Sequence, residues 1–486
     1  MKYFYLFFVT VLSFASVTSA QVSVSGGTGL AVTYATLTNA GGLFAAINAT
    51  AQTGNNIIVT ITADIATETG TTSLNTGTWT SITISPSGAR TISGTVAAPL
   101  INLNGADNVT INGLNTGGNT FTLSNTSTSA TAETSTIRFI SGATNNVITN
   151  CTVLGSATIP LATNGGTIYF STDGVTVNGN DNNTISNCNI GPAGANLPAK
   201  AIYGIGTTTS AAKRNNGILI NNNNIFDFFN ATNGTSGIHI LSGNDDWTVS
   251  NNRIYQTASR VFTTASQRYS GIVVNTATLP GSFTITGNTI GFANAAGTGT
   301  TIVANNSSEF RGIDAAQVST TTATSIQGNI ISGINYSSGR SSNVFTNSCF
   351  IGIMLGITGG YFNCGGTTGN TIGSLDGSST ITVNASSTFI NTAPMMCIYD
   401  ITANGNTISN NNMGSITINP IGGTGTEVGF RGIFVNTTVT GVTATINNNM
   451  IGGSAAGSIT DNLIGVSAGG YSMYCIQVFK IGRAHV

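Results

Sequence analysis

The stretch I-S-N-C-N-I at residues 185–190 is one copy of a phrase that returns along the chain. Each copy has an apolar residue, then Asn or Gly, then a second apolar residue. Copies begin at Ile148, Ile185, Ile220, Val249, Ile285, Ile326, Ile408 and Ile446, with a degraded copy at Thr367. Successive copies are 37, 35, 29, 36, 41, 41, 41 and 38 residues apart. Self-similarity at a nearly constant period indicates stacked repeats, each packed only against its neighbours.

A second signature, a Gly-Ile pair within an apolar run, lies upstream of the phrase in most repeats. Its glycines are Gly204, Gly237, Gly271, Gly312, Gly352 and Gly432, and Cys397 and Cys475 take the same place in two further copies. Two short apolar strands per repeat, separated by Gly, Asn, Thr and Ser turns, predict one turn of a coil of strands. We expect the surplus residues, such as 291–308, to form loops.

The repeated asparagines have a structural explanation. Asn and Gly tolerate the left-handed backbone of a tight bend between two strands. Stacked coils place equivalent side chains about 4.8 Å apart, so their amides can hydrogen-bond along the stack. We therefore predict an asparagine ladder rather than a ligand site at Asn150, Asn187, Asn222, Asn251, Asn410 and Asn448.

The phrase, the Gly-Ile strand and the charge-poor composition resemble the right-handed parallel β-helix of the pectin-lyase-like superfamily. They are most similar to its bacterial surface proteins. The resemblance covers residues 105–480 well and 21–105 loosely, and it implies an all-β solenoid with an N-terminal cap. It does not fix a function, because such folds carry lyases, glycosidases and adhesins alike.

The two ends of the chain have separate explanations. Residues 1–20, with Lys2 before an apolar run and small residues before Gln21, have the form of a secretory signal peptide. The alternative is a membrane anchor, but the run is short for a span of about 20 residues. We expect an exported protein, secreted or on the cell surface, with no transmembrane segment in the mature chain.

The remaining residues divide into three parts. Residues 21–105 are expected to form the cap and first coils, with a short helix near 40–47, and residues 106–480 the β-helix repeats. Residues 481–486 fit no repeat position and match the translation of a common short-read sequencing adapter. We expect that tail to be an artefact and the natural protein to continue beyond Phe479; a genuine basic tail is the alternative.

Composition excludes some functions. Only 6% of the residues are charged and the formal net charge is -1, which gives no support to nucleic-acid binding. No Cys or His spacing suggests a metal site, and no cofactor motif occurs. Hydrophobic residues make up 40% of the chain, enough for a long core.

Two of the six cysteines fall at the same place in consecutive phrases. Stacking would set the Cα atoms of Cys151 and Cys188 about 4.8 Å apart, within the range of a disulfide. Export permits oxidation. A pair of reduced cysteines replacing two asparagines is the alternative, and the sequence does not decide between them.

Carboxylates and aromatic rings are the remaining candidates for a site. The β-helix enzymes that the chain resembles use carboxylates on an exposed sheet face, and Asp245 with Asp246 is the best pair here. Asp227 or Asp314 could partner one of them; the alternative is a solvated turn. Glu309 and Arg311 are expected to be an exposed ion pair. For sugar stacking, the weak aromatic candidates are Trp247, Phe226 and Phe228, although buried rings are the commoner use.

The sequence favours a non-enzymatic extracellular protein that binds polysaccharide or cell-surface glycan through loops on a rigid solenoid. Many weak contacts along the repeat would then add up. The alternative is a polysaccharide lyase or glycoside hydrolase of the same fold that uses Asp245 or Asp246. Ice binding by flat threonine rows is a third reading, and the uneven repeat lengths argue against it.

Overall fold

The structure is a computed structural model that describes residues 20–176, 178–276, 281–305, 307–340, 344–385, 395–402, 404–421, 428–437, 443–462 and 472–479. The predicted signal peptide, apart from its last residue, and the tail at 481–486 lie outside the described residues.

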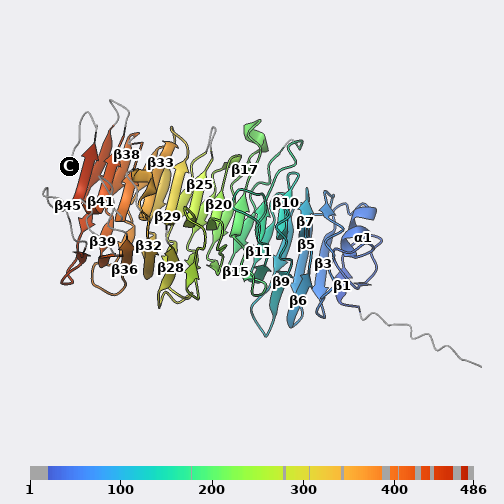
Figure 1. Cartoon of the computed structure of the whole chain (residues 1–486). Helices are drawn as coiled ribbons and strands as arrows, with labels where there is room; N and C mark the ends of the chain where they lie inside the picture. Colours follow the sequence, from blue (N-terminus) through green and yellow to red (C-terminus); the bar gives the residue numbers. More distant parts are fainter. Residues whose placement is uncertain are drawn as a thin grey trace, which may run out of the picture.

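The chain is a parallel β-helix, an elongated rod with the N-terminal coils at one end and the C-terminal coils at the other (Figure 1). Each full coil contributes one strand to each of three long sheets, which we name A, B and C. One coil, for example, consists of β14 (Thr184–Ser186) in sheet A, β15 (Asn189–Pro192) in sheet B and β16 (Lys200–Gly204) in sheet C. The fold expected from the repeats is confirmed.

Sheet A has 14 strands: β2 (Thr33–Tyr34), β1 (Val22–Ser25), β3 (Asn56–Ile61), β5 (Ser81–Pro86), β8 (Val109–Asn112), β11 (Val147–Thr149), β14, β18 (Leu219–Asn221), β22 (Thr248–Ser250), β26 (Thr284–Thr286), β30 (Thr324–Gln327), β34 (Phe362–Cys364), β38 (Asn406–Ser409) and β42 (Ala444–Asn447). Sheet B has 11: β6 (Ala89–Gly94), β9 (Thr120–Asn125), β12 (Cys151–Gly155), β15, β19 (Asn224–Phe226), β23 (Arg253–Tyr255), β27 (Thr289–Gly291), β31 (Ile330–Ser332), β35 (Thr371–Gly373), β39 (Asn412–Gly414) and β43 (Met450–Ile451). Sheet C has 12: β4 (Leu74–Asn75), β7 (Pro99–Asn104), β10 (Ser135–Ile140), β13 (Ile168–Phe170), β16, β20 (Thr235–Ile240), β25 (Arg268–Asn275), β29 (Glu309–Gln317), β33 (Phe350–Gly359), β37 (Met395–Asp400), β41 (Val428–Asn436) and β45 (Ser472–Phe479).

The core is a set of stacked apolar columns in exact register from coil to coil. In sheet A, the first apolar residue of each phrase lies beside its equivalent in the next coil, as Ile148 does beside Ile185 and Ile185 beside Ile220. These three side chains are fully buried. A slip of one residue would turn the whole column outward, so the burial of this face fixes the register.

A fourth sheet, which we name E, was not expected from the sequence. It contains β24 (Arg260–Val261), β28 (Thr301–Asn305), β32 (Ile334–Ser338), β36 (Ile381–Ala385), β40 (Ile416–Pro420) and β44 (Ile459–Asp461). The loop predicted at 291–308 is therefore partly wrong, because β28 lies within it. Strand residues of this sheet such as Val303, Val383 and Ile418 are fully buried, and this burial explains why the surplus residues form strands.

The N-terminal end of the solenoid is closed by its own elements. Strand β1 pairs antiparallel with both β2 and β3, and the helix α1 (Leu43–Ala49) buries Leu43, Phe44 and Ile47. This covers an edge that would otherwise present unpaired backbone groups. The predicted cap and its short helix are confirmed. Among the described residues, no helix has the length and apolar character that crossing a membrane requires.

The asparagine ladder lies one residue later than predicted. The predicted residues Asn150, Asn187, Asn222, Asn251, Asn410 and Asn448 all have φ between 54° and 60° and form the left-handed bend between sheets A and B. Some bond to each other, as Asn222 Nδ2 donates to Asn187 Oδ1 at 2.7 Å, but at the surface. The buried ladder occupies the next position, because the bend turns that side chain inward: Asn223, Asn252, Asn288, Asn329, Asn370, Asn411 and Asn449.

Candidate functional site

The predicted carboxylate pair serves the fold. Asp245 lies in β21 (Asn244–Asp245), which pairs with β17 (Asn215–Asn216) in a small sheet of two strands. Its Oδ2 is 2.7 Å from Arg214 Nη1 and its Oδ1 accepts a hydrogen bond from the Gly281 amide at 2.7 Å. Asp246 has a φ of 53° and its Oδ1 accepts from the Ser282 amide at 2.9 Å. Both carboxylates therefore fix the start of the next coil.

The carboxylates proposed as their partners are also engaged. Asp227 accepts hydrogen bonds from the Thr257 amide at 2.8 Å and from its hydroxyl at 2.6 Å, and it forms an ion pair with Arg260. Asp314 Oδ2 is 3.0 Å from Arg268 Nη1. Each of these carboxylates is held by a neighbouring group, as expected of structural ion pairs.

Two of the three predicted aromatic candidates lie in the core. Trp247 is fully buried, donates its indole N–H to the Asn215 carbonyl at 3.0 Å and packs edge-on against Phe170. Phe228 is fully buried and stacks on Tyr269 at 5.5 Å between ring centroids. Neither ring is accessible to a sugar.

Phe226 is the one predicted aromatic residue that reaches the surface. It is half-buried on the outer face of sheet B, and its ring stacks on Tyr255 of the next coil, 5.7 Å between centroids and 15° between planes. Gly191 lies on the other side, where a Cβ would come within 2.6 Å of the Phe226 ring. The close approach therefore requires glycine in the preceding coil. We name Phe226 and Tyr255 the aromatic platform.

A row of polar side chains runs beside the aromatic platform. Asn224 and Arg253 stand two residues before Phe226 and Tyr255 on β19 and β23, so they share the same face of sheet B. Asn224 Nδ2 donates to Asn189 Oδ1 at 2.8 Å, and Arg253, which is exposed, donates to the Thr289 hydroxyl at 3.0 Å. Amide, guanidinium and hydroxyl groups thus flank two stacked rings.

The paired cysteines replace asparagines of the buried ladder. Cys151 and Cys188 are buried free thiols, and the Cys188 amide donates to Asn223 Oδ1 at 2.9 Å, as a ladder asparagine would. Each thiol also donates to the backbone, Cys188 to the Ser186 carbonyl at 3.2 Å. The contact with Cys188 and burial together raise the pKa of the Cys151 thiol. The structure thus shows the reduced pair, one of the two alternatives left by the sequence.

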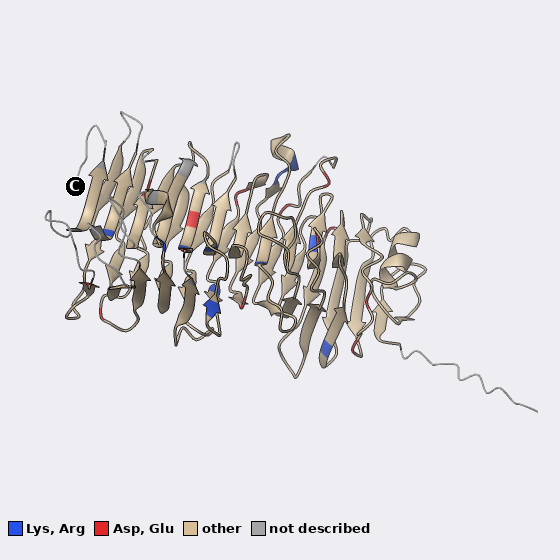
Figure 2. Ribbon diagram, in the orientation of Figure 1, with Lys and Arg blue, Asp and Glu red and all other residues tan. Residues whose placement is uncertain are grey.

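The largest ionic network was missed at the sequence level. Figure 2 shows how few charged residues the rod carries, and several of them meet on the outer face of sheet C. Glu309, expected to be exposed, is 5% exposed and binds Arg268, Arg311 and Arg340 at 2.8, 3.0 and 2.9 Å. Burial raises the pKa of Glu309, but the arginines outweigh it and hold the pKa below its ordinary value.

The covering loop explains the burial of this network. Arg311 donates to the carbonyls of Thr346 at 2.6 Å and Ser348 at 3.0 Å, and Arg340 donates to the Asn347 carbonyl at 2.9 Å. The segment that contains η2 (Phe345–Asn347) is therefore tied down over β29. The prediction of an exposed pair was wrong because sequence periodicity does not show which strands a loop covers.

Further along sheet C, Lys200 and His239 are buried, and no carboxylate of the described residues bonds to either of them. Lys200 Nζ donates to the carbonyls of Pro160 and Leu161, at 3.0 and 3.2 Å, and burial lowers its pKa to about 7. His239 Nδ1 has no hydrogen-bond partner in the part of the chain that the structure describes. Burial, and then the charges of Lys200 and Arg268, lower the pKa of His239 to about 3, so the imidazole is neutral.

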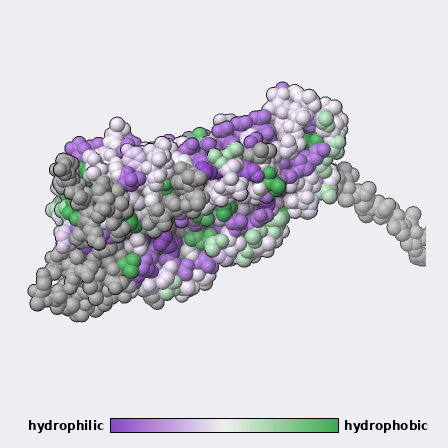
Figure 3. Space-filling model, turned by 90° about the horizontal axis from the view of Figure 1, so that it is seen from above, coloured by the Kyte–Doolittle hydropathy of each residue, from purple (hydrophilic) through white to green (hydrophobic). Residues whose placement is uncertain are grey.

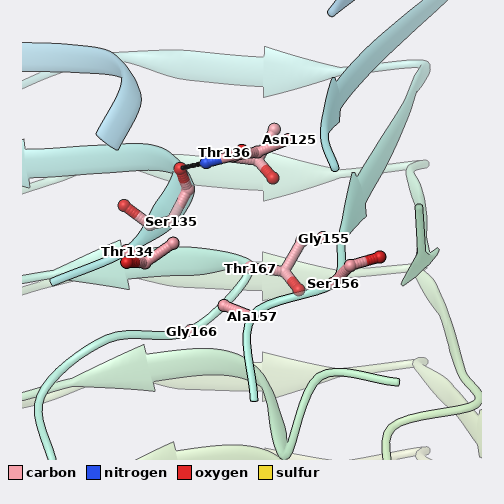
Figure 4. Close-up of a pocket in the computed structure, with 9 residues that line it drawn as sticks. All are labelled: Asn125, Thr134, Ser135, Thr136, Gly155, Ser156, Ala157, Gly166 and Thr167. Atoms are coloured by element: carbon pink, nitrogen blue, oxygen red, sulfur yellow. Dashed lines mark hydrogen bonds between the residues drawn. The ribbon is translucent and has the colours of Figure 1, made fainter. Parts of the chain in front are cut away.

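A small pocket between sheets B and C has too little space for an organic ligand (Figure 4). Its solvent-sized space is about 10 Å³, which is the room of a single water molecule. Thr167, whose buried hydroxyl has no partner among the described residues, lines it together with Thr136 and Asn125. We interpret it as a hydration site. Among the described residues, no cluster of His, Cys, Asp and Glu could hold a metal ion.

The face shown in Figure 3 is mostly hydrophilic, with hydrophobic residues scattered in small groups over its described part. Scattered exposed apolar residues are normal for a soluble surface. A partner on this face would therefore be recognised largely through uncharged polar groups.

Comparison with known proteins gives little further guidance. No protein-family model and no curated protein matches the chain. Two solved structures of PfbA, a surface adhesin of Streptococcus pneumoniae, are similar to it at 15% sequence identity. The match to the first covers 90% of this chain and 95% of the PfbA chain, with a TM-score of 0.36. The match to the second covers 89% of this chain and 88% of the PfbA chain, with a TM-score of 0.34. Likenesses this weak carry no conclusion about function.

Proposed function

We propose that this protein is exported and binds glycans outside the cell or at its surface, without transforming them. The observation that carries the proposal is the aromatic platform, in which the half-buried ring of Phe226 stacks on Tyr255, itself 7% exposed, beside the half-buried Asn224 and the exposed Arg253. Tyr255 and Gly191 cover the two sides of the Phe226 ring, so a sugar would pack its apolar face against the exposed ring edge. The neighbouring amide and guanidinium groups would supply hydrogen bonds to its hydroxyls.

The rod suits a multivalent binder. Consecutive coils are fixed at about 4.8 Å, so polar side chains on one sheet face form a rigid, regular row. Such a row needs no ordering when it binds, and many weak contacts to a repeating polymer add up. The engaged carboxylates Asp245, Asp246 and Asp314 support binding over hydrolysis, because each one already has a hydrogen-bonding or ionic partner.

The test uses residues 21–479 with a panel of neutral and acidic polysaccharides, and it measures both retention on each glycan and the release of new reducing ends or unsaturated products. We expect retention without turnover. Phe226→Ala should weaken binding about 5- to 10-fold, as expected for one stacked ring, while Phe226→Tyr, which keeps the ring, should not. Val175→Ala, which removes a 79% exposed apolar side chain elsewhere, is the control. Turnover by the unmodified protein would overturn the proposal in favour of the enzyme alternative.

A second candidate function is favoured by sheet A. Two outward columns run along it in register and contain no charged residue: Thr110, Val147, Thr184, Leu219, Thr248, Thr284, Ser325, Asn363, Thr407 and Thr445 in one, and Asn112, Thr149, Ser186, Asn221, Ser250, Thr286 and Gln327 in the other. The sequence argued against ice binding because repeat lengths vary, yet sheet A itself keeps one register through these coils.

Apart from Val147 and Leu219, the two columns consist of hydroxyl and amide side chains, and such a regular array would suit an ordered surface such as ice. The measurement is thermal hysteresis of the purified protein, with Thr248→Lys as the variant that places a charge in the first column. Hysteresis that disappears in this variant would favour this candidate over glycan binding. Its absence in the unmodified protein would exclude it.

A further inference from the structure

From β27 onward, the connections between sheets B and E alternate between long and short, after a connection of residues 256–259 between β23 and β24. The chain takes residues 292–300 to pass from β27 to β28, only Gly333 from β31 to β32, and residues 374–380 from β35 to β36. It then takes only Ser415 from β39 to β40, and residues 452–458 from β43 to β44. Loops therefore project from every second coil, roughly 9 to 10 Å apart, which is twice the spacing between strands. Each short connection leaves a gap between two loops.

The first gap is open. It forms a groove of about 360 Å³, with Phe292 and Gly333 at its base, residues 297–300 on one side and residues 377–380 on the other. This is the size of a pocket for one small organic ligand. Thr298, Thr300, Ser378, Ser379 and Thr380 supply hydroxyl groups, and no charged residue lines the groove.

The base of the groove holds an aromatic ring in a strained position. Phe292 has a φ of 61°, a left-handed conformation that is uncommon for a bulky residue and is frequent at functional sites. The half-buried ring lies against Gly333, where an added Cβ would be 2.5 Å from it. The short connection at Gly333 therefore leaves space for the Phe292 ring. This ring is the apolar surface of an otherwise polar groove.

Both walls are fixed by their own hydrogen bonds. In the first loop, the Ala293 amide donates to the Thr298 carbonyl at 2.9 Å and Asn294 Nδ2 donates to the Thr298 hydroxyl at 2.7 Å. In the second, Ser374 Oγ accepts from the Gly377 amide at 3.1 Å, and Asp376 Oδ1 accepts from the Ser378 amide at 2.9 Å. A ligand would meet preformed walls and lose little free energy to ordering them.

The second gap, at Ser415, is closed by contacts between the loops on either side of it. The Ser454 amide donates to the Leu375 carbonyl at 3.0 Å, so the two loops touch. Ser374 Oγ lies 3.0 Å from Ser415 Oγ, and the Ser415 amide donates to Ser458 Oγ at 3.3 Å. The loops on either side of Ser415 therefore hydrogen-bond to each other, whereas those on either side of Gly333 leave a groove between them.

We propose that the groove at Phe292 binds one saccharide unit of a neutral glycan. The inference rests on the proposed glycan binding and adds a second site at the same end of sheet B as the aromatic platform, further along the rod: β27 pairs with β23, and Phe292 follows β27 directly. The Phe292 ring would pack against the C–H face of a pyranose, and the threonine and serine hydroxyls would bond to its hydroxyls. The residues that line the groove carry no charge, which favours a neutral sugar; the nearby guanidinium of Arg253 lies outside this lining, with Nη1 3.6 Å from the position of a Cβ added at Gly297.

The test exploits the backbone of Phe292. Phe292→Gly removes the ring and relieves the left-handed strain, so the variant should fold at least as stably as the unmodified protein. Its affinity for a neutral oligosaccharide, measured by calorimetry, should fall about tenfold. Asn251→Gly makes the matching change at a φ of 57°, at an exposed position in the bend between sheets A and B, and should leave the affinity unchanged. Ser378→Trp, which fills the groove and keeps Phe292, should lower the affinity as Phe292→Gly does.

The outcomes separate the two proposals when Phe226→Ala is measured in parallel. Binding that is weakened by Phe226→Ala but unchanged by Phe292→Gly and Ser378→Trp overturns the groove and leaves the proposed function standing. Equal losses in Phe292→Gly and Asn251→Gly also overturn the groove, since the effect would then be a general one. If the unmodified protein binds no glycan of the panel, both proposals fail.

Discussion

The carboxylate of Glu309 lies 3.0 Å from the guanidinium of Arg311, two residues further along the same strand, and the Arg311 side chain is fully buried. Arg268 and Arg340 bind the same carboxylate. Burying these charges removes them from water, which is costly unless each keeps its partners. In a chain with 6% charged residues, this cluster is the place where one substitution would leave most charge uncompensated.

Glu309→Gln should destabilise the protein strongly. It removes the negative charge that three arginines share, and breaking a buried pair in this way costs about 3–5 kcal/mol. The free energy of unfolding from urea titrations measures the loss. Glu133→Gln is the control, because Glu133 pairs with Arg138 with 44% of its side chain exposed and such a pair contributes about 0–1 kcal/mol. Equal losses in both variants would contradict the role given to the cluster.

The ladder gives a prediction that distinguishes adjacent asparagines. Asn252 Nδ2 donates to the Ile220 carbonyl and to Asn288 Oδ1, both at 2.9 Å, and its Oδ1 accepts from Asn223. Asn252→Ala would leave several buried groups unpaired, each at about 1–3 kcal/mol, so a loss above about 3 kcal/mol is expected.

The neighbouring residue is the control. Asn251 has a φ of 57° and an exposed side chain, so Asn251→Gly should change the free energy of unfolding by no more than a few tenths of a kcal/mol. Thermal unfolding of both variants measures the contrast. A larger loss for Asn251→Gly than for Asn252→Ala would mean that the ladder is at the predicted position after all.

The fold followed from the sequence because the apolar columns have a clear period, as the register of Ile148, Ile185 and Ile220 shows. The position of the ladder did not follow from the sequence, because a run such as 221–224 consists only of asparagine and does not show which of the four forms the ladder. A signal was nevertheless present. The copies beginning at Ile285 and Ile326 have glycine at the third place and asparagine at the fourth, and glycine has no side chain with which to continue a ladder.

The candidate site was less accessible to sequence reasoning. Phe226 and Phe228 are two residues apart, yet one is half-buried and the other fully buried, because the chain leaves sheet B directly after Phe226 and bends at Asp227, whose φ is 51°. The groove at Phe292 depends on which connections are short, a property of whole coils rather than of any motif. Burial of Glu309 likewise depends on a loop that arrives from the following coil.

For Cys188→Asn, the sign of the change in the free energy of unfolding depends on whether the thiols of Cys151 and Cys188 are reduced or joined in a disulfide. Cys188→Asn would restore a ladder rung, with an oxygen for the Cys151 amide and a donor for Asn223. In the reduced protein we expect stabilisation by about 1 kcal/mol. If the exported protein instead carries a disulfide, the same substitution breaks it and costs about 2–4 kcal/mol.

The measurement for the thiols is the urea midpoint of Cys188→Asn and of the unmodified protein, each with and without reductant. A midpoint of the unmodified protein that falls on reduction, together with a destabilised variant, would contradict the reduced pair and assign the disulfide.

The buried His239 should make stability depend on pH below neutrality. Its pKa is about 3 in the folded protein, against about 6.5 in an unfolded chain. Between these values the unfolded state binds more protons, so the free energy of unfolding falls as the pH falls, by up to about 1.4 kcal/mol per pH unit. The groups that face the imidazole, Lys200, Arg268 and the ring of Tyr203, cannot compensate, since two are cations and the third is neutral.

His239→Val tests this, because Val273 occupies the same column in the next coil. We expect the free energy of unfolding of the unmodified protein to fall, relative to that of the variant, by about 2–3 kcal/mol between pH 7 and pH 4.5. Urea titrations at both pH values measure it, and the variant controls for carboxylates that titrate in the same range. Parallel pH dependence in the two proteins would show that the imidazole can be protonated without opening the fold, and that its surroundings reach solvent more readily than its 7% exposure indicates.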